Sequence, residues 1–187
     1  MNTHQLLLIR HAETDLAGTF CGISNPPINE RGQRQIQMLL KTLAGQSIGT
    51  VYSSGLQRAI STAEAISVHF NAPLQIVSDL HEISFGEWES FTWNQIEGRD
   101  PVYARQWIEN YPNQPTPNGE LFEVFKARVL RAIDTIASAG ENATIVAHAG
   151  VLRVVMTHRC KLTEEQAWLQ TSSYCSIFRY PALGVPA

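Results

Sequence analysis

Leu6-Leu7-Leu8-Ile9-Arg10-His11-Ala12-Glu13-Thr14 decides the fold of this chain. The apolar run that starts beside Gln5 has the length of a buried strand, and it stops abruptly at an arginine, a histidine and a glutamate. Open α/β sheets bind their ligands at the carboxyl ends of their parallel strands. The stretch therefore predicts a buried strand that delivers Arg10 and His11 to a ligand crevice, although a lone arginine and histidine are also compatible with a plain loop.

Three further segments end in the same way, as an apolar or β-branched run followed by polar residues. They are Thr50–Ser54 with Arg58 at the start of the next helix, Leu74–Val77 with Glu82 beyond it, and Ala143–Ala147 with His148 directly after it. The carboxyl ends of parallel strands meet at one edge of a sheet. We therefore expect these polar side chains to converge on Arg10 and His11.

Helical patterns alternate with the strands, over Glu30 to Leu43, Gln57 to His69, Gly119 to Ala139 and Val151 to His158. In the third helix, apolar side chains recur at helical spacing, which predicts core positions at Phe122, Phe125, Val129, Ile133 and Ile136. Strands that alternate with helices predict an α/β fold, here a three-layer αβα sandwich with a mostly parallel central sheet.

The chain has 187 residues and a hydrophobic composition of 44%, which suits one substantial core, so we expect a single domain over residues 1–187. An insert at about residues 87–118 interrupts the alternation with aromatic residues and four prolines. Its irregular composition predicts a partly helical lid above the strand ends. The aromatic side chains either pack the lid on the sheet or cover a ring-bearing part of a substrate, and we expect packing for most of them.

The net charge of −3 and the pI near 6.1 argue against nucleic acid as a partner, because phosphate backbones select basic surfaces. No apolar stretch approaches the roughly 18 residues of a membrane span, and the start lacks a secretory pattern, so we expect no membrane contact and a cytoplasmic location. Three cysteines without regular spacing fit a reducing compartment and no zinc site. We expect no metal and no cofactor, and the oligomeric state, monomer or homodimer, stays open.

Four ordered motifs resemble those of the histidine phosphatase superfamily, which includes the cofactor-dependent phosphoglycerate mutases. They are Arg10-His11-Ala12-Glu13, Ser53 to Glu64, Glu82 to Glu89 and Ala147 to Arg153. The first departs from the usual pattern of the family at Ala12, where glycine is common. The resemblance runs from the first strand to beyond residue 150, and it implies an enzyme that transfers a phosphoryl group through a phosphorylated histidine.

The resemblance also implies roles for the matched residues. His11 is the nucleophile, Glu82 is the general acid and base, and the phosphate pocket is lined by Arg10, Arg58 and His148. Further substrate contacts are implied at Thr14, Cys21, Gly22 and Ala149. The loop around Cys21 is equally compatible with a plain glycine-rich connection.

These residue types suit phosphoryl transfer. The transferring group spreads negative charge over three oxygens, and guanidinium forks grip such oxygens two at a time. A neutral imidazole attacks phosphorus, and a carboxylic acid protonates the leaving alkoxide before its carboxylate activates water. The scheme requires no metal ion, and the sequence has no acidic cluster typical of a magnesium site.

Other residues compete with this assignment. Glu87 and Glu89 lie on the same segment as Glu82, and spacing alone does not separate the three. Glu13 is expected to orient an arginine or the nucleophile rather than to carry protons. The remaining histidines, at positions 4, 69, 81 and 158, are expected on the surface or in structural hydrogen bonds.

Within the superfamily, the chain resembles bacterial α-ribazole phosphatases through Asn118-Gly119-Glu120 and the following Phe122, Phe125, Arg128 and Val129. The leading hypothesis is a phosphomonoesterase for a small phosphorylated metabolite, with α-ribazole 5'-phosphate as a candidate. A phosphoglycerate mutase is the first alternative. It is disfavoured because the lid offers only Arg99 and Arg105 and because Ala17 stands where mutases carry asparagine. A phosphate-binding regulator without turnover is the second alternative, and the end of the chain, from Phe178 to Ala187, leaves open whether a final edge strand is missing.

Overall fold

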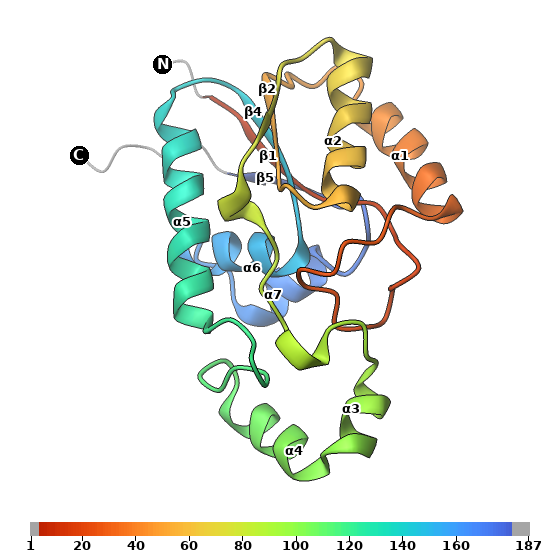
Figure 1. Cartoon of the computed structure of the whole chain (residues 1–187). Helices are drawn as coiled ribbons and strands as arrows, with labels where there is room; N and C mark the ends of the chain where they lie inside the picture. The colour runs from red at the N-terminus through yellow and green to blue at the C-terminus, as the bar shows by residue number, and fades with distance from the viewer. Residues whose placement is uncertain (1–3, 181–187) are drawn as a thin grey trace, which may run out of the picture.

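The computed structural model describes residues 4–180, which form an α/β fold around a five-stranded sheet (Figure 1). The strands are β1 (Leu6–Arg10), β2 (Thr50–Ser53), β3 (Leu74–Ile76), β4 (Ala143–Ala147) and β5 (Ile177–Tyr180), in the spatial order β3-β2-β4-β1-β5. The first four strands run parallel to one another, and β5 pairs antiparallel with β1 at one edge. The predicted, mostly parallel sheet is confirmed.

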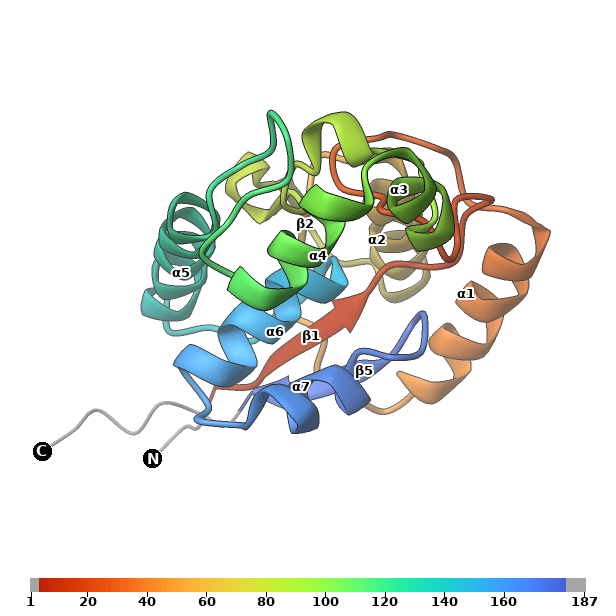
Figure 2. The ribbon, with the colours of Figure 1, turned by 90° about the horizontal axis from the view of Figure 1, so that it is seen from below.

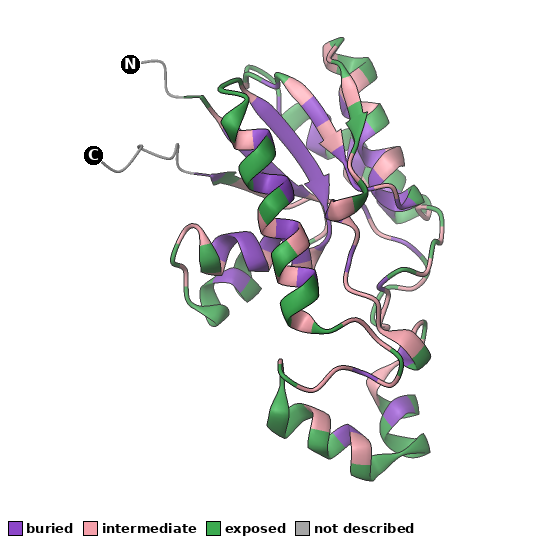
Figure 3. Cartoon of the chain, turned by 60° about the vertical axis from the view of Figure 1, so that its left-hand side comes forward, coloured by how far each residue is buried: buried purple, intermediate pink, exposed green. Residues whose placement is uncertain are grey.

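Helices cover both faces of the sheet, because side chains alternate along its central strands. Leu7 and Ile9 of β1 pack with α1 (Glu30–Thr42) and α2 (Gln57–Phe70). Leu6 and Leu8 pack on the opposite face with α5 (Phe122–Ser138) and α6 (Ala149–His158), and α7 (Glu164–Gln170) lies against α6. Figure 3 shows the buried strands between the helical layers. The αβα sandwich is therefore confirmed.

The long helix α5 contributes the core residues that its spacing predicts. Phe125, Val129, Ile133 and Ile136 are buried. Phe122 is partly buried and lies at the edge of the cavity described below. The 3.6-residue period therefore identifies the helix face that meets the sheet, and it fails only in the first turn, where the helix leaves the core.

The segment after β3 forms a partly helical lid at the carboxyl ends of the parallel strands (Figures 1 and 2). The short 3₁₀ helix η1 (Ser78–Leu80) still packs on the sandwich core through Leu80, and the lid itself consists of the 3₁₀ helix η2 (Gly86–Trp88), α3 (Trp93–Arg99) and α4 (Pro101–Asn110). Thr92 and Gln95 form a capping box at the start of α3, and Asp100 caps α4 with Pro101 in its first turn. These local signals start two short helices in a segment without a long apolar period.

The lid has an apolar cluster of its own. Trp88, Ile96 and Ala104 are buried in it, and six aromatic side chains pack around them: Phe20, Phe85, Phe91, Trp93, Tyr103 and Trp107. The Trp88 ring centroid lies 5.1 Å from that of Trp107 and 5.4 Å from that of Phe20. Most lid aromatics therefore pack against one another, and Phe20 ties this cluster to the loop after β1.

Two elements are not predicted by the sequence analysis, α7 and β5. α7 has seven residues, and its start is marked by a capping box of Thr163 and Gln166 that stands beside no long apolar run. β5 has four residues, one of them Arg179, and it answers the open question about a final edge strand. Positions 181–187 lie outside the described residues. None of the helices that the structure describes has both the length and the hydropathy of a membrane span.

Candidate active site

His11 directly follows β1, and two neighbours hold its imidazole in one tautomer. Nδ1 lies 2.7 Å from the carbonyl oxygen of Ala12, which can only accept, so Nδ1 carries the proton. Nε–H of Arg58 donates to Nε2 of His11 at 3.2 Å. Nε2 is therefore the unprotonated nitrogen of His11, with the lone pair that a nucleophile needs.

The surroundings of His11 keep this imidazole neutral. Burial is the largest reason that the pKa of His11 falls well below 6.5, and the guanidiniums of Arg58 and Arg10 lower it further. The hydrogen bond to Ala12 acts in the opposite direction and does not offset them. The nucleophilic form is therefore present at neutral pH and below it.

His148 follows β4 and lies beside His11, with 5.0 Å between the ring centroids. Its Nε2 is 2.7 Å from the hydroxyl oxygen of Ser54, and its buried Nδ1 has no hydrogen-bond partner within residues 4–180. Burial, and next the proximity of His11 and Arg58, hold the pKa of His148 well below 6.5. Both imidazoles are therefore neutral at pH 7.

Arg10, the last residue of β1, is anchored at the end of α7. One Nη group donates to the carbonyl oxygens of Thr171 at 2.8 Å and Ser172 at 3.0 Å. These carbonyl groups follow the last residue of α7 and accept no hydrogen bond within the helix. The Tyr174 ring lies under the guanidinium, 3.8 Å from its carbon to the ring centroid. The Nε of Arg10 is buried without a partner among the described residues, so it remains available to an anion.

Arg58 lies on α2 and is fully buried beneath the loop that follows β1. Its Nη groups donate to the carbonyl oxygens of Ser24 at 2.6 Å and Gly22 at 2.7 Å, with a longer bond to Cys21 at 3.3 Å. Because its Nε contacts His11, Arg58 joins His11 to this loop through one guanidinium.

Glu89 holds the same loop from the other side. Its carboxylate accepts the backbone N–H groups of Gly22 at 3.1 Å, Ile23 at 3.0 Å and Ser24 at 3.0 Å, and that of Phe85 at 2.9 Å. A side chain at position 22 would collide with this carboxylate, so glycine is required there. The loop is therefore fixed between a carboxylate that binds its N–H groups and a guanidinium that binds its carbonyl groups.

Glu82 is the glutamate of the three rivals that lines the cavity. Its carboxylate accepts the N–H of Gly150 at 2.9 Å and that of Ile83 at 3.0 Å. A Cβ at position 150 would collide with it, so only glycine permits this approach. The carboxylate of Glu87 instead accepts from Asn118 at 2.6 Å.

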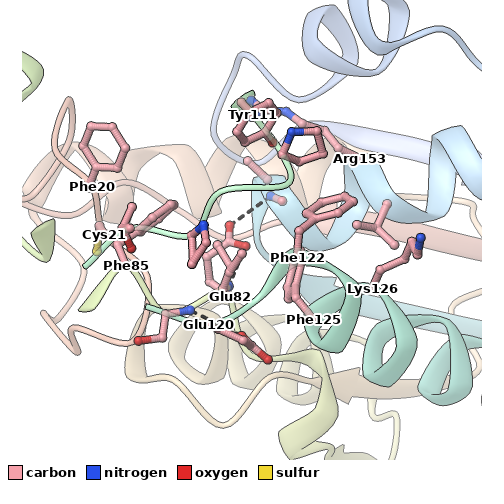
Figure 4. Close-up of a pocket in the computed structure, with 18 of the residues that line it drawn as sticks. Phe20, Cys21, Glu82, Phe85, Tyr111, Glu120, Phe122, Phe125, Lys126 and Arg153 are labelled. Atoms are coloured by element: carbon pink, nitrogen blue, oxygen red, sulfur yellow. Dashed lines mark hydrogen bonds between the residues drawn. The ribbon is translucent and has the colours of Figure 1, made fainter. Parts of the chain in front are cut away.

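A cavity of about 880 Å³ opens beside His11, between the lid and the strand ends (Figure 4). Of the residues that the sequence singles out, six line it: Arg10, His11, Thr14, Cys21, Glu82 and Ala149. Arg58, His148 and Gly22 lie behind this surface and reach it through His11 and the loop. Aromatic side chains make much of the remaining wall, including Phe20, Phe85, Trp93, Trp107, Tyr111 and Phe122.

Glu13 lies away from the cavity wall and serves the start of α1. Its carboxylate is 3.3 Å from Asn29 Nδ2 and 3.4 Å from Gln35 Nε2, and it pairs with Arg31 at 3.6 Å. Glu13 therefore holds together the two ends of the loop between β1 and α1, rather than orienting His11. Among residues 4–180, no three or more histidine, cysteine, aspartate or glutamate side chains are grouped as metal ligands.

Sequence reasoning missed several residues of this site. Tyr174 lies beyond the last recognisable motif, and no pattern announces it. Ser54, Glu89 and Arg153 stand inside the motifs, but their partners are distant in sequence, so only the fold reveals what they contact.

The family model "Histidine phosphatase superfamily (branch 1)" matches residues 6–181. The adenosylcobalamin/alpha-ribazole phosphatase of Escherichia coli (strain K12) is 32% identical over 168 residues, which cover 88% of this chain and 83% of that protein. The solved alpha-ribazole phosphatase of Shigella flexneri has a TM-score of 0.79 and 31% identity, and covers 88% of this chain and 84% of that one. YhfR of Bacillus stearothermophilus has a TM-score of 0.82 at 25% identity, over 98% of both chains. The chain therefore belongs to the histidine phosphatase superfamily, branch 1, and is a phosphoric monoester hydrolase.

Proposed function

We propose that the protein hydrolyses a small phosphate monoester without a metal ion, by way of a phosphohistidine at His11. One observation carries this proposal: the unprotonated Nε2 of His11, the open donors of Arg10 and the carboxylate of Glu82 meet at one cavity. They supply a nucleophile, fixed positive charge and a proton carrier. Together these account for both halves of a covalent phosphatase reaction.

In the first step, the Nε–H of Arg58 releases Nε2 of His11, the freed lone pair attacks phosphorus, and the bond between phosphorus and the ester oxygen breaks. Glu82, in its protonated form, gives its proton to the leaving oxygen, so that a neutral alcohol departs. Arg10 and the Nε–H that Arg58 has released stabilise the charge that spreads over the phosphoryl oxygens, and His148 packs beside the phosphorylated ring.

In the second step, the Glu82 carboxylate takes a proton from water as that water attacks phosphorus. The bond between Nε2 and phosphorus breaks, inorganic phosphate leaves, and Glu82 is again protonated. His11 returns to its neutral form with the proton still on Nδ1, because the Ala12 carbonyl holds it there throughout.

α-Ribazole 5'-phosphate is the first ester that we propose. Two kinds of support favour it: the activity for which the Escherichia coli and Shigella flexneri relatives are named, and the aromatic wall of the cavity, which suits a ring-bearing alcohol. We propose a cytoplasmic enzyme whose partner is this small molecule, with no nucleic acid and no membrane.

A mutase would need further cations for a substrate carboxylate in the lid. Arg99 stacks on Phe91, 3.8 Å from the ring centroid, and neither it nor Arg105 lines the cavity. The lid itself therefore offers no cation to such a carboxylate, which favours hydrolysis; Lys126 and Arg153, which do line the cavity, belong to α5 and α6. Incubation with 3-phosphoglycerate and a bisphosphoglycerate primer tests this, because 2-phosphoglycerate formed faster than free phosphate would contradict a hydrolase.

Phosphate release from α-ribazole 5'-phosphate, measured with purified protein, tests the proposed function. We expect turnover, an acid-labile phosphorylated protein in rapid-quench samples, and a loss of at least about 10³-fold in kcat for His11→Ala. His69→Ala, on the exposed face of α2, is the matched control and should retain full activity. Binding of phosphate without release from any ester would instead indicate a regulator without turnover.

A further inference from the structure

Arg153 of α6 has a guanidinium that the protein holds in one place. Its Nε donates to the hydroxyl oxygen of Thr171 at 2.8 Å, and its guanidinium carbon lies 3.6 Å from the centroid of the Trp168 ring. The Thr171 side chain is itself fully buried. Stacking and a hydrogen bond therefore fix a side chain that is usually flexible.

Apart from the Trp168 ring, the charge of Arg153 has no close partner among the described residues: the carboxylates that act on it, Glu82 and Glu164, form no ion pair with it. The side chain is partly buried, yet none of the ion pairs within residues 4–180 includes it, and its two Nη groups donate to no described residue. A partly desolvated cation without a partner is unfavourable unless something else binds it. The two Nη groups carry four N–H donors. Because Arg153 lines the cavity, these donors are open to a ligand there.

The position of Arg153 within the cavity indicates which part of a bound substrate it would contact. Arg153 lines the same cavity as His11 and Glu82, and Figure 4 shows it beside Tyr111, on the side of Glu82 away from Phe20 and Phe85. A phosphoryl group at His11 and Arg10 places the ester oxygen at Glu82, which protonates it. The atoms beyond that oxygen belong to the alcohol part of the substrate, and this part passes Arg153.

We propose that Arg153 is a specificity-determining residue that binds oxygen acceptors, either hydroxyl groups or a carboxylate, on the alcohol part of the substrate. The inference rests on the proposed phosphatase function and adds a substrate class to it: esters whose alcohol bears such oxygens close to the phosphate. A guanidinium fork grips two oxygens at once, which gives selectivity as well as binding. Esters of plain hydrocarbon alcohols or phenols do not use this residue.

Lys126 provides a matched control from the same cavity. It also lines the wall, but its ammonium is 2.7 Å from a carboxylate oxygen of Glu123, its partner one turn earlier on α5. Its charge is therefore already satisfied. Figure 4 shows Lys126 on the far side of Phe122 from Glu82.

The experiment compares kcat/KM of wild type, Arg153→Met and Lys126→Met for three esters. Phenyl phosphate has no acceptor beyond its ester oxygen, ribose 5-phosphate has hydroxyl groups, and 2-phosphoglycolate has a carboxylate but no hydroxyl group. For Arg153→Met we expect a loss of about tenfold or more for one or both oxygen-rich esters and a change within about threefold for phenyl phosphate. The ester that loses most identifies the hydroxyl or the carboxylate source, and Lys126→Met should change none of them by more than about threefold.

An equal loss for all three esters would overturn the proposal, because it would show that Arg153 merely supports Arg10 through Thr171. Unchanged rates for all three would overturn it as well. Arg153→Lys keeps the charge but not the fork, and the same selective loss is expected in it, which tests the proposal even where Arg153→Met fails to fold. Failure of wild type to release phosphate from any of the three esters and from α-ribazole 5'-phosphate would instead contradict the proposed function.

Discussion

Single residues around His11 show how one set of charges serves two purposes. In the proposed mechanism Arg10 and Arg58 form the anion site, and the structure shows that the same guanidiniums add to burial in lowering the pKa of His11, so that its imidazole stays unprotonated at Nε2. Without them, a histidine near its ordinary pKa would be partly protonated at pH 6 to 7 and would then have no lone pair at Nε2. Binding and activation of the nucleophile are therefore coupled by the same side chains.

Arg58→Met tests this coupling. Removal of the guanidinium removes the second largest cause of the shift, so we expect the pKa of His11 to rise toward 6.5, while burial still keeps it lowered. The acid limb of kcat/KM should move to higher pH in the same variant. An NMR titration of the imidazole carbon and nitrogen signals, assigned with His11→Gln, measures the shift.

Arg34→Met is the control for that titration, because Arg34 lies on the exposed side of α1 and contacts Glu30 rather than the site. It should leave the His11 titration unchanged. An Arg58→Met protein whose His11 titrates at the wild-type pH, or at a lower pH, would show that burial alone sets the pKa.

At the scale of secondary structure elements, the sequence predicts the helices and strands that have a regular apolar pattern and the polar residues that directly follow a strand. The strands β1, β2 and β4 and the helices around them follow from such patterns, and so does the convergence of His11, Glu82 and His148. The contacts made by α7 and β5 could not be predicted, because these elements are too short for a period. Tyr174 and Thr171, which contact Arg10, lie in or beside them, so this part of the site depends on tertiary structure alone.

The loop after β1 is the element whose fixation is easiest to test. Glu89→Gln keeps the shape of the side chain but replaces one acceptor oxygen by a donor that faces backbone N–H groups. We expect the free energy of unfolding to fall by about 1–3 kcal/mol and kcat/KM to fall by about tenfold or more, because the carbonyl groups of Gly22 and Ser24 then no longer orient Arg58. Urea unfolding and steady-state kinetics measure the two effects.

Glu87→Gln is the matched control, since Glu87 lies two residues earlier, is exposed and accepts from the Asn118 amide. Its free energy of unfolding should stay within about 0.5 kcal/mol of wild type. Equal effects of the two substitutions would mean that the negative charge of this segment matters, rather than the backbone hydrogen bonds that Glu89 accepts.

At the scale of the whole molecule, apolar burial occurs in separate clusters. Two lie on the two faces of the sheet, and a third consists of lid aromatics with Phe20. We propose that residues 1–187 form a single domain in which positions 87–118 are a lid insert. The cavity lies where the lid cluster meets the strand ends, so the proposed site depends on contacts that are not part of the sandwich core.

Trp88→Ala separates the stability of the lid from that of the sandwich. Trp88 is 7% exposed and contacts the rings of Phe20 and Trp107, so its truncation removes the centre of the lid cluster. We expect faster hydrogen exchange in α3 and α4 and a higher KM for a ring-bearing ester, while the amides of β1 and β4 stay protected. Ile133→Ala, on the buried face of α5, should instead lower the free energy of unfolding of the whole protein by about 2–5 kcal/mol. If Trp88→Ala accelerated exchange equally in β1, β4 and the lid, the lid and the sandwich would unfold as one cooperative unit, and the aromatic cluster would be part of a single core.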